Sequence, residues 1–258
     1  MQVSYSKVDS YWTCPFLYKL RYIDKLKTKP DTNPASALYE GTSLHEAIEK
    51  RSIDEGLNSY KSNYNELGPE HEFEIYKLER AMKKALDQIK IEGEYERKLA
   101  YNDFIGFIDM LVPVDEGVFD LYDFKYSNSV ENYKKSGQVH VYKYYFEKMT
   151  GQQIRNMYYI MIPKCPEKYD EFKLEDLKEK VDKFYEIHDV TFEKVEFDKD
   201  KVNNFFARKT LMEKEKVFEK RYSFKCNWCE YKKYCSSRGE DTSELLIETK
   251  TEEVNLWE

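Results

Sequence analysis

Two aspartates and one lysine in the middle of the chain form a group that is suited to metal-assisted cleavage of phosphodiesters. Asp109 lies fourteen residues before Asp123, and Lys125 follows Asp123 after a single phenylalanine. Mg²⁺ and Mn²⁺ prefer oxygen ligands, and an ion held by few protein groups keeps water and room for a phosphate. A lysine beside such an ion is placed to position and help deprotonate the attacking water. The pattern Asp-x-Lys is common by itself, so its context decides the interpretation.

The segments around these residues are predicted to form two antiparallel strands that position the three side chains. Residues 103–112 and 117–126 are rich in β-branched and aromatic residues, and the connection between them contains proline and glycine. Because side chains alternate along a strand, Asp123 and Lys125 share one face. If the hairpin brings Asp109 level with Asp123, two carboxylates and one ammonium group meet in a small volume.

Further candidates lie on helices that are predicted before and after these strands. His45 lies in a helical pattern at 35–50 and is a candidate for a third metal ligand. Judged alone, this residue is equally well explained as an exposed histidine on a helix. Gln138 and Tyr142 are four residues apart and share one face of the following helix. From that face they reach the lysine, the metal-bound water or a nucleic-acid backbone. A lone tyrosine is more commonly a packing residue.

In this order, the motifs resemble the PD-(D/E)XK nuclease superfamily and, within it, the RecB-like branch. The matching residues are Gly41-x₃-His45, Gly106-x₂-Asp109, Asp123-x-Lys125 and Gln138-x₃-Tyr142. The resemblance implies that Mg²⁺ or Mn²⁺ is bound by His45, Asp109, Asp123 and the backbone carbonyl of Phe124. It implies a catalytic group of Lys125, Asp109, Asp123, Gln138 and Tyr142, in which the lysine acts on the water and the glutamine–tyrosine pair contacts the substrate. Many relatives carry glutamate at the position of Asp123, and both residues fit the family pattern.

The cysteines indicate a second metal centre. Cys226, Cys229 and Cys235 lie close together, Cys14 lies near the other end, and Cys165 makes the total five. An odd number of cysteines without a secretion signal argues against a disulfide framework and favours thiolate ligation of a metal. The spacing alone leaves zinc and an iron–sulfur cluster open, and zinc is the more frequent of the two.

The resemblance favours the iron–sulfur cluster. Iron–sulfur members of the RecB-like branch, including the AddB nuclease domain and the exonucleases of CRISPR adaptation, carry one cysteine before the nuclease core and three after it. The resemblance therefore implies a [4Fe-4S] cluster on Cys14, Cys226, Cys229 and Cys235 that joins the two ends of the chain. Metal binding then contributes free energy to folding. Cys165 lies outside the pattern and is predicted to be free.

Composition predicts an intracellular protein with an uneven distribution of charge. The mean hydropathy is -0.82, no apolar run is long enough to span a membrane, and no signal-peptide stretch is apparent, so a cytoplasmic, reducing location is expected. The net charge is -7, but residues 1–30 carry +4, residues 205–238 carry +6 and residues 240–258 carry -6. The last segment is therefore predicted to be an acidic, flexible tail.

The two basic ends are those that carry the cluster cysteines. Bringing them together is expected to create a positive surface with aromatic residues, which suits phosphate contacts and base stacking on single strands. The aromatic residues are Tyr11, Trp12, Tyr18, Tyr22, Trp228, Tyr231 and Tyr234. For any one of them, an ordinary core aromatic is the alternative.

The order of elements predicts an α/β fold with a PD-(D/E)XK (restriction-endonuclease-like) core, in which helices flank a mixed central sheet. Helices are expected at 4–24, 36–53, 70–91, 173–187 and 198–217 and from Gln138 onward, with a polar segment at 56–69. Strands are expected at 94–100, 103–112, 117–126, 153–162 and 190–197. One domain is predicted over residues 1–239, followed by the tail at 240–258.

These expectations predict a Mg²⁺- or Mn²⁺-dependent deoxyribonuclease, as an exonuclease on single-stranded DNA or DNA ends in recombination, repair or replication. One alternative is an end-processing endonuclease within a CRISPR-adaptation or recombination complex. A second alternative, from another class, is a non-cleaving DNA-binding subunit. The complete set of catalytic motifs argues against the second alternative.

Overall fold

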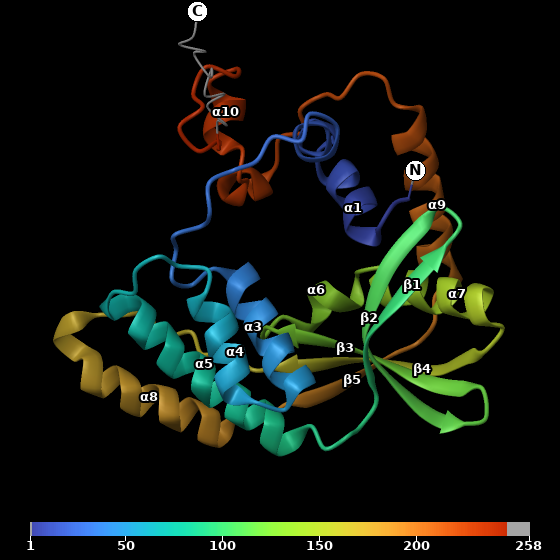
Figure 1. The fold of residues 1–258 in the computed structure, drawn as a ribbon. Helices are drawn as coiled ribbons and strands as arrows, with labels where there is room; N and C mark the ends of the chain where they lie inside the picture. Colours follow the sequence, from blue (N-terminus) through green and yellow to red (C-terminus); the bar gives the residue numbers. More distant parts are fainter. Residues whose placement is uncertain (1, 247–258) are drawn as a thin grey trace, which may run out of the picture. The chain divides into compact units, whose positions relative to one another are not determined.

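The computed structural model describes residues 2–246, which form two compact units (Figure 1). The first, termed the sheet unit, comprises residues 2–5 and 31–206. The second, termed the cysteine unit, comprises residues 6–30 and 207–246, so it is built from both ends of the described chain. Within these residues, none of the helices combines the length and the apolar composition that a membrane span requires.

A mixed five-stranded sheet forms the centre of the sheet unit. Its strands lie in the order β1 (Glu94–Tyr101), β2 (Phe104–Asp115), β3 (Val118–Tyr126), β4 (Gln153–Ile162) and β5 (Thr191–Val195). Only β3 and β4 pair in parallel, which requires a crossover, and α6 (Val130–Lys134) and α7 (Gln138–Thr150) lie in that connection. The predicted α/β class with a mixed sheet is confirmed.

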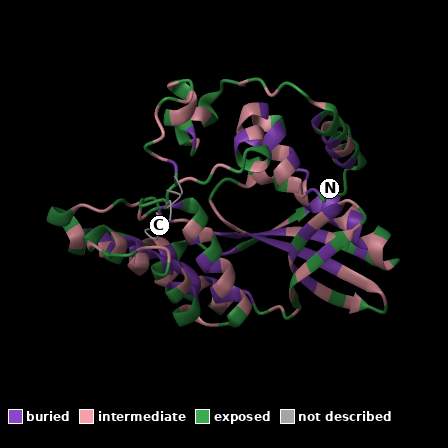
Figure 2. Ribbon diagram, turned by 45° about the horizontal axis from the view of Figure 1, so that its top comes forward, coloured by how far each residue is buried: buried purple, intermediate pink, exposed green. Residues whose placement is uncertain are grey.

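One face of β3 packs against four helices. These are α3 (Ala37–Lys50), α4 (Ile53–Lys61), α5 (Pro69–Gln88) and α8 (Leu174–Ile187). Residues of these helices form one apolar core with Tyr122 and Phe124 of β3. Figure 2 shows the buried residues of the sheet and of these helices in purple. This core fixes α3, and therefore the position of His45, relative to β3.

The other face of β3 is covered by α7. Phe119 packs against Phe146 of that helix, with 5.5 Å between the ring centroids. Since side chains alternate along a strand, Asp123 and Lys125 lie on the α7 side and Phe124 lies on the side of the four-helix core. Helix α9 (Lys199–Lys214) follows β5 in the chain.

Helix α4 differs from prediction, because much of it lies in the segment expected to be a polar connection. It begins after Ser52, whose side-chain oxygen accepts a hydrogen bond from the backbone N–H of Glu55. This serine followed three residues later by glutamate is a helix-start signal that the sequence contains. The prediction of a polar connection instead followed Gly56 and Pro69, which bound the segment.

At Gly56, α4 packs closely against α3. A Cβ atom at this position would lie 2.6 Å from Cβ of Ala47 and 2.7 Å from the carbonyl oxygen of Ser43. We expect Gly56→Ala to lower the free energy of unfolding by about 1–3 kcal/mol, because the overlap outweighs the better helix propensity of alanine. Urea denaturation measures this. The control is Gly41→Ala in α3, where a Cβ meets nothing within 4 Å, and which is expected to be neutral or stabilising. Equal effects of the two substitutions would contradict the close packing.

The cysteine unit has short helices and a small apolar core. Its elements include α1 (Tyr5–Thr13), α2 (Pro15–Tyr18), the π-helix η1 (Lys19–Ile23), the 3₁₀ helix η3 (Phe224–Trp228) and α10 (Lys232–Ser236). The helix predicted over 4–24 is interrupted at Cys14, which is extended because Pro15 disfavours helical backbone in the residue before it. The core consists of Leu20, Tyr231 and Leu245 with partly buried neighbours.

The described part of the predicted acidic tail is packed rather than free. Leu245 is 7% exposed and forms an isolated bridge with Thr28. The backbone N–H of Lys29 donates to the carbonyl of Glu244. The tail prediction is therefore corrected for residues 240–246, because Leu245 completes the small core. Residues 247–258 lie outside the described residues.

Candidate active site

The candidate site lies where strands β2 and β3 separate. The pairing between β2 and β3 ends at Met110 and Tyr122. Beyond this pair, the backbone N–H of Phe124 donates to a carboxylate oxygen of Asp109 at 2.7 Å. Asp109 and Asp123 each lie one residue beyond the last pair, so the hairpin places the two carboxylates at the same level. The interrupted ladder thereby frees the backbone of β3 to take part in a site.

Asp123 is a buried carboxylate with an incomplete set of partners. Its side chain is 1% exposed, and it forms an ion pair with Lys125. Neither of its oxygens has a geometrically satisfactory hydrogen bond among the described residues. Buried carboxylates normally have several hydrogen bonds, because burying an unsatisfied charge is costly. A divalent cation would satisfy these oxygens, so the residue fits a metal site.

The pKa values show that, without a metal, the two carboxylates of the site do not both ionise at neutral pH, whereas Lys125 stays charged. Burial, followed by the charge of Asp123, raises the pKa of Asp109 to about 8. Burial by itself would lower the pKa of Lys125. The carboxylates of Asp123 and Asp109 outweigh this effect and raise the pKa above its ordinary value, so the ammonium form persists. Two neighbouring carboxylates in a low-dielectric site attract a cation. In this state Lys125 is suited to orient water and to stabilise anionic oxygen.

His45 reaches the site from α3. Its Nε2 lies 3.1 Å from the carbonyl oxygen of Phe124, and its Nδ1 lies 3.8 Å from a carboxylate oxygen of Asp109. Burial, followed by the charge of Lys125, lowers the pKa of His45. The neutral imidazole is the form that ligates metals. The predicted ligands His45, Asp109 and the Phe124 carbonyl therefore lie together.

Glu96 of β1 is a further candidate ligand that the sequence reasoning missed. Ligand atoms of Glu96, His45 and Asp109 all lie within 4.8 Å of one another. The residues on either side of Glu96 pair with β2, whereas Glu96 has a left-handed backbone with φ of 49°. Such backbone strain is often found at functional sites. Burial, followed by the charge of Asp109, raises the pKa of Glu96.

We expect Glu96→Gln to weaken Mn²⁺ binding about 10- to 100-fold, because the amide removes a charged oxygen from the group. Titration calorimetry on the full chain measures the dissociation constant. The matched control is Glu94→Gln on the same strand, because Glu94 pairs with Arg97 and lies outside the group. An unchanged dissociation constant in Glu96→Gln would remove Glu96 from the metal site.

Gln138 and Tyr142 approach the carboxylates from α7. The Gln138 side-chain amide donates to the Tyr142 hydroxyl at 3.0 Å. Burial raises the pKa of Tyr142 to about 12, and Asp123 and Asp109 add to the shift, so the phenol stays neutral. A Cβ at Gly106 would lie 2.9 Å from the Tyr142 ring. Glycine in Gly106-x₂-Asp109 therefore leaves room for this tyrosine.

Four of the five cysteines lie in the cysteine unit. Burial raises the pKa of Cys229, and Cys235 and Cys14 contribute to the shift, which indicates that these thiols are neighbours. Backbone N–H groups point at two sulfurs: that of Arg221 at Cys14 Sγ, 3.4 Å away, and that of Ser223 at Cys226 Sγ, 3.5 Å away. The fifth, Cys165, lies in the core of the sheet unit.

The aromatic residues predicted to stack on bases differ in exposure. Tyr11, Tyr18 and Tyr231 are buried, so they belong to the interior of the cysteine unit and are not available for stacking. Trp12 and Trp228 are exposed. For the three tyrosines, the alternative reading as core aromatics is the right one, because the unit has few other apolar residues to fill its interior.

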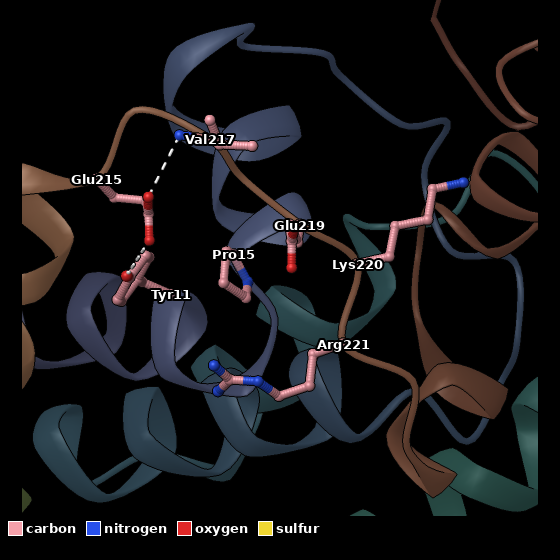
Figure 3. A pocket seen from close by; sticks show the side chains of 7 residues that line it. All are labelled: Tyr11, Pro15, Glu215, Val217, Glu219, Lys220 and Arg221. Atoms are coloured by element: carbon pink, nitrogen blue, oxygen red, sulfur yellow. Dashed lines mark hydrogen bonds between the residues drawn. The ribbon is translucent and has the colours of Figure 1, made fainter.

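A hollow of about 320 Å³ is also present in the cysteine unit (Figure 3). It is lined by Tyr11, Pro15, Glu215, Val217, Glu219, Lys220 and Arg221. Glu215 accepts hydrogen bonds from the Tyr11 hydroxyl at 3.0 Å and from the backbone N–H of Val217 at 3.3 Å. Its acids and bases are mixed, and the hollow contains none of the candidate metal ligands.

Comparisons with known proteins give one informative match. A family model described as the PD-(D/E)XK nuclease superfamily matches residues 2–236. The comparison with curated proteins gives no match. Among solved structures, the chain resembles a candidate exonuclease from Eubacterium rectale with 12% identity and a TM-score of 0.43, over 87% of this chain and 91% of that chain. A structural likeness at that score has no bearing on function.

Proposed function

Because the chain belongs to the PD-(D/E)XK nuclease superfamily, we propose that it is a Mg²⁺- or Mn²⁺-dependent deoxyribonuclease. We propose further that it acts as an exonuclease on single-stranded DNA or DNA ends, in recombination, repair or replication. The observation that carries the proposal is the buried carboxyl pair Asp109 and Asp123, which lies beside Lys125 and His45 and in which both oxygens of Asp123 lack satisfactory hydrogen bonds.

In this proposal the metal ligands are His45, Asp109, Asp123 and the Phe124 carbonyl, with Glu96 beside them. When bound, the ion polarises the phosphate and lowers the pKa of a coordinated water. Lys125 orients the water and stabilises negative charge on the phosphate oxygens. The neutral Tyr142 hydroxyl, held by Gln138, donates a hydrogen bond to the substrate backbone. The core behind Phe124 keeps bulk water from that side of the site.

We propose that Cys14, Cys226, Cys229 and Cys235 hold a [4Fe-4S] cluster with a structural role. The four cysteines belong to the cysteine unit, and the pKa of Cys229 responds to Cys235 and Cys14. The two N–H groups directed at sulfur support a role of these sulfurs as metal-bound thiolates, which hydrogen bonds stabilise.

The nuclease proposal is tested with 5′- and 3′-labelled single-stranded and double-stranded DNA. With Mg²⁺ or Mn²⁺, we expect the parent to degrade linear single strands from an end and to leave circular single strands intact. EDTA or Lys125→Ala is expected to stop the reaction. Intact DNA in every reaction would support the non-cleaving alternative, and linearised circles would support the endonuclease alternative.

A further inference from the structure

Three large aromatic side chains lie exposed in one short stretch of the cysteine unit. Tyr222, Phe224 and Trp228 are 78%, 72% and 77% exposed. Single exposed apolar side chains are ordinary, but a group of them marks an interaction surface. We term these three residues, together with Arg221 and Lys225, the aromatic surface.

The three rings share one side of the backbone. The rings of Phe224 and Trp228 meet edge to face, with centroids 6.1 Å apart and planes at 81°. Ser223 is extended, with φ of -155° and ψ of 173°, so its neighbours Tyr222 and Phe224 project to the same side. Tyr222 is therefore exposed on the same side of the stretch as the Phe224–Trp228 pair.

The stretch that carries these rings is basic. Residues 220–228 contain three basic residues and no acidic ones. The Arg221 guanidinium lies over the Trp12 ring at 5.3 Å and donates to the Trp12 carbonyl, and the Arg208 guanidinium lies over the same ring at 4.4 Å. Lys225 reaches the Thr13 hydroxyl at 3.4 Å. Arg221 and Lys225 thus lie in the same short stretch as the three exposed rings, which suits an anionic ligand that also has flat rings.

We propose that the aromatic surface binds single-stranded DNA, with bases stacked on the rings and phosphates paired with the cations. A duplex hides the faces of its bases, whereas a single strand exposes them, so aromatic side chains select the single strand. The positive charge of the stretch favours a nucleic acid, whose phosphates are anionic, over an uncharged apolar partner. This proposal rests on the proposed function and deepens it, because it assigns the single-stranded substrate to a defined surface.

The same stretch is tied to the cysteines. The N–H groups of Arg221 and Ser223, which flank Tyr222, point at the sulfurs of Cys14 and Cys226. A bound cluster therefore fixes the backbone from which Tyr222 and Phe224 project. Removing the cluster is therefore expected to weaken single-strand binding. This loss is expected without any change in the ligands of the candidate metal site, which lie in the sheet unit.

The test is fluorescence anisotropy of labelled oligo(dT), with Lys125→Ala as the parent so that the DNA stays intact. We expect Phe224→Ala and Trp228→Ala each to raise the dissociation constant about 5- to 150-fold. Trp228→Phe is expected to retain most of the affinity. The control is Phe172→Ala, an 89% exposed aromatic of the sheet unit, which is expected to bind as the parent does. Iron content confirms that each variant is folded.

Unchanged affinity for oligo(dT) in both alanine variants would overturn the proposal. A loss of affinity for a blunt duplex equal to the loss for oligo(dT) would also overturn it. Retained DNA affinity combined with lost binding to vesicles of phosphatidylserine and phosphatidylcholine would assign the surface to a membrane instead and would also overturn it. The nuclease proposal fails separately. If the wild-type chain leaves DNA intact with either metal while the alanine variants lose oligo(dT) binding, only the nuclease proposal is lost.

Discussion

Asp123→Asn is expected to lower the rate of DNA cleavage about a thousandfold or more and to leave the metal-free protein at least as stable as the parent. The rate falls because the substitution removes a charged metal ligand and the partner of Lys125. Stability is maintained because the charge of Asp123 raises the pKa of Asp109, so its loss allows Asp109 to ionise and take over the pairing with Lys125. Asp109 remains to attract the Lys125 ammonium group.

Asp120→Asn is the matched control for this experiment. Asp120 lies on the same strand and is 4% exposed, but it accepts hydrogen bonds from the Arg155 guanidinium and from the backbone and side-chain amides of Asn156. Loss of its charge is therefore expected to destabilise the protein by about 1–3 kcal/mol. The two variants thus distinguish Asp120, whose carboxylate stabilises the fold, from Asp123, whose carboxylate takes part in the chemistry.

Thermal denaturation with and without Mn²⁺ measures these effects. At about 100 times its dissociation constant, the ion is expected to stabilise the parent and Asp120→Asn by about 2.7 kcal/mol, or roughly 5 to 10 °C. Asp123→Asn is expected to lose most of that shift. A destabilised metal-free Asp123→Asn, or a full Mn²⁺ shift in that variant, would contradict the assignment of Asp123 as a metal ligand kept at the expense of stability.

The strands of the sheet and α7 were predictable because their signals are local. Alternation along β3 separates Asp123 and Lys125 from Phe124, and turn residues mark the hairpin before it. Glu96 was not predictable, because its proximity to Asp109 depends on the register of β1 with β2 and on a left-handed backbone. Its pattern in the sequence is that of any glutamate in a polar strand.

The interior of the cysteine unit was equally beyond local patterns. Tyr11 and Trp12 are adjacent in the sequence and similar in chemistry, yet the first is 5% exposed and the second 40%. The difference arises from contacts between distant parts of the chain, such as the hydrogen bond from Tyr11 to Glu215. Composition predicted a surface of basic and aromatic residues, but only the packing shows which rings remain for a ligand.

Cys229→Ser is expected to lower the iron content from about four atoms per chain to nearly none and to unfold the cysteine unit. The apolar core of that unit consists of Leu20, Tyr231 and Leu245 with a few partly buried neighbours. So small a core supplies little stability by itself, and domains of that kind commonly depend on a metal. The sheet unit has its own large core and is expected to persist.

Iron analysis and limited proteolysis of the full chain test this together. In Cys229→Ser, cleavage is expected within residues 6–30 and 207–246, while a fragment close to 31–206 remains. The control is Cys165→Ser in the core of the sheet unit, which is expected to keep the iron and the protease resistance of the parent. Stoichiometric zinc without iron in the parent would assign the four cysteines to a zinc site. Retained iron and an unchanged proteolysis pattern in Cys229→Ser would remove Cys229 from the metal centre, and stability would then have to come from Leu20, Tyr231 and Leu245 alone.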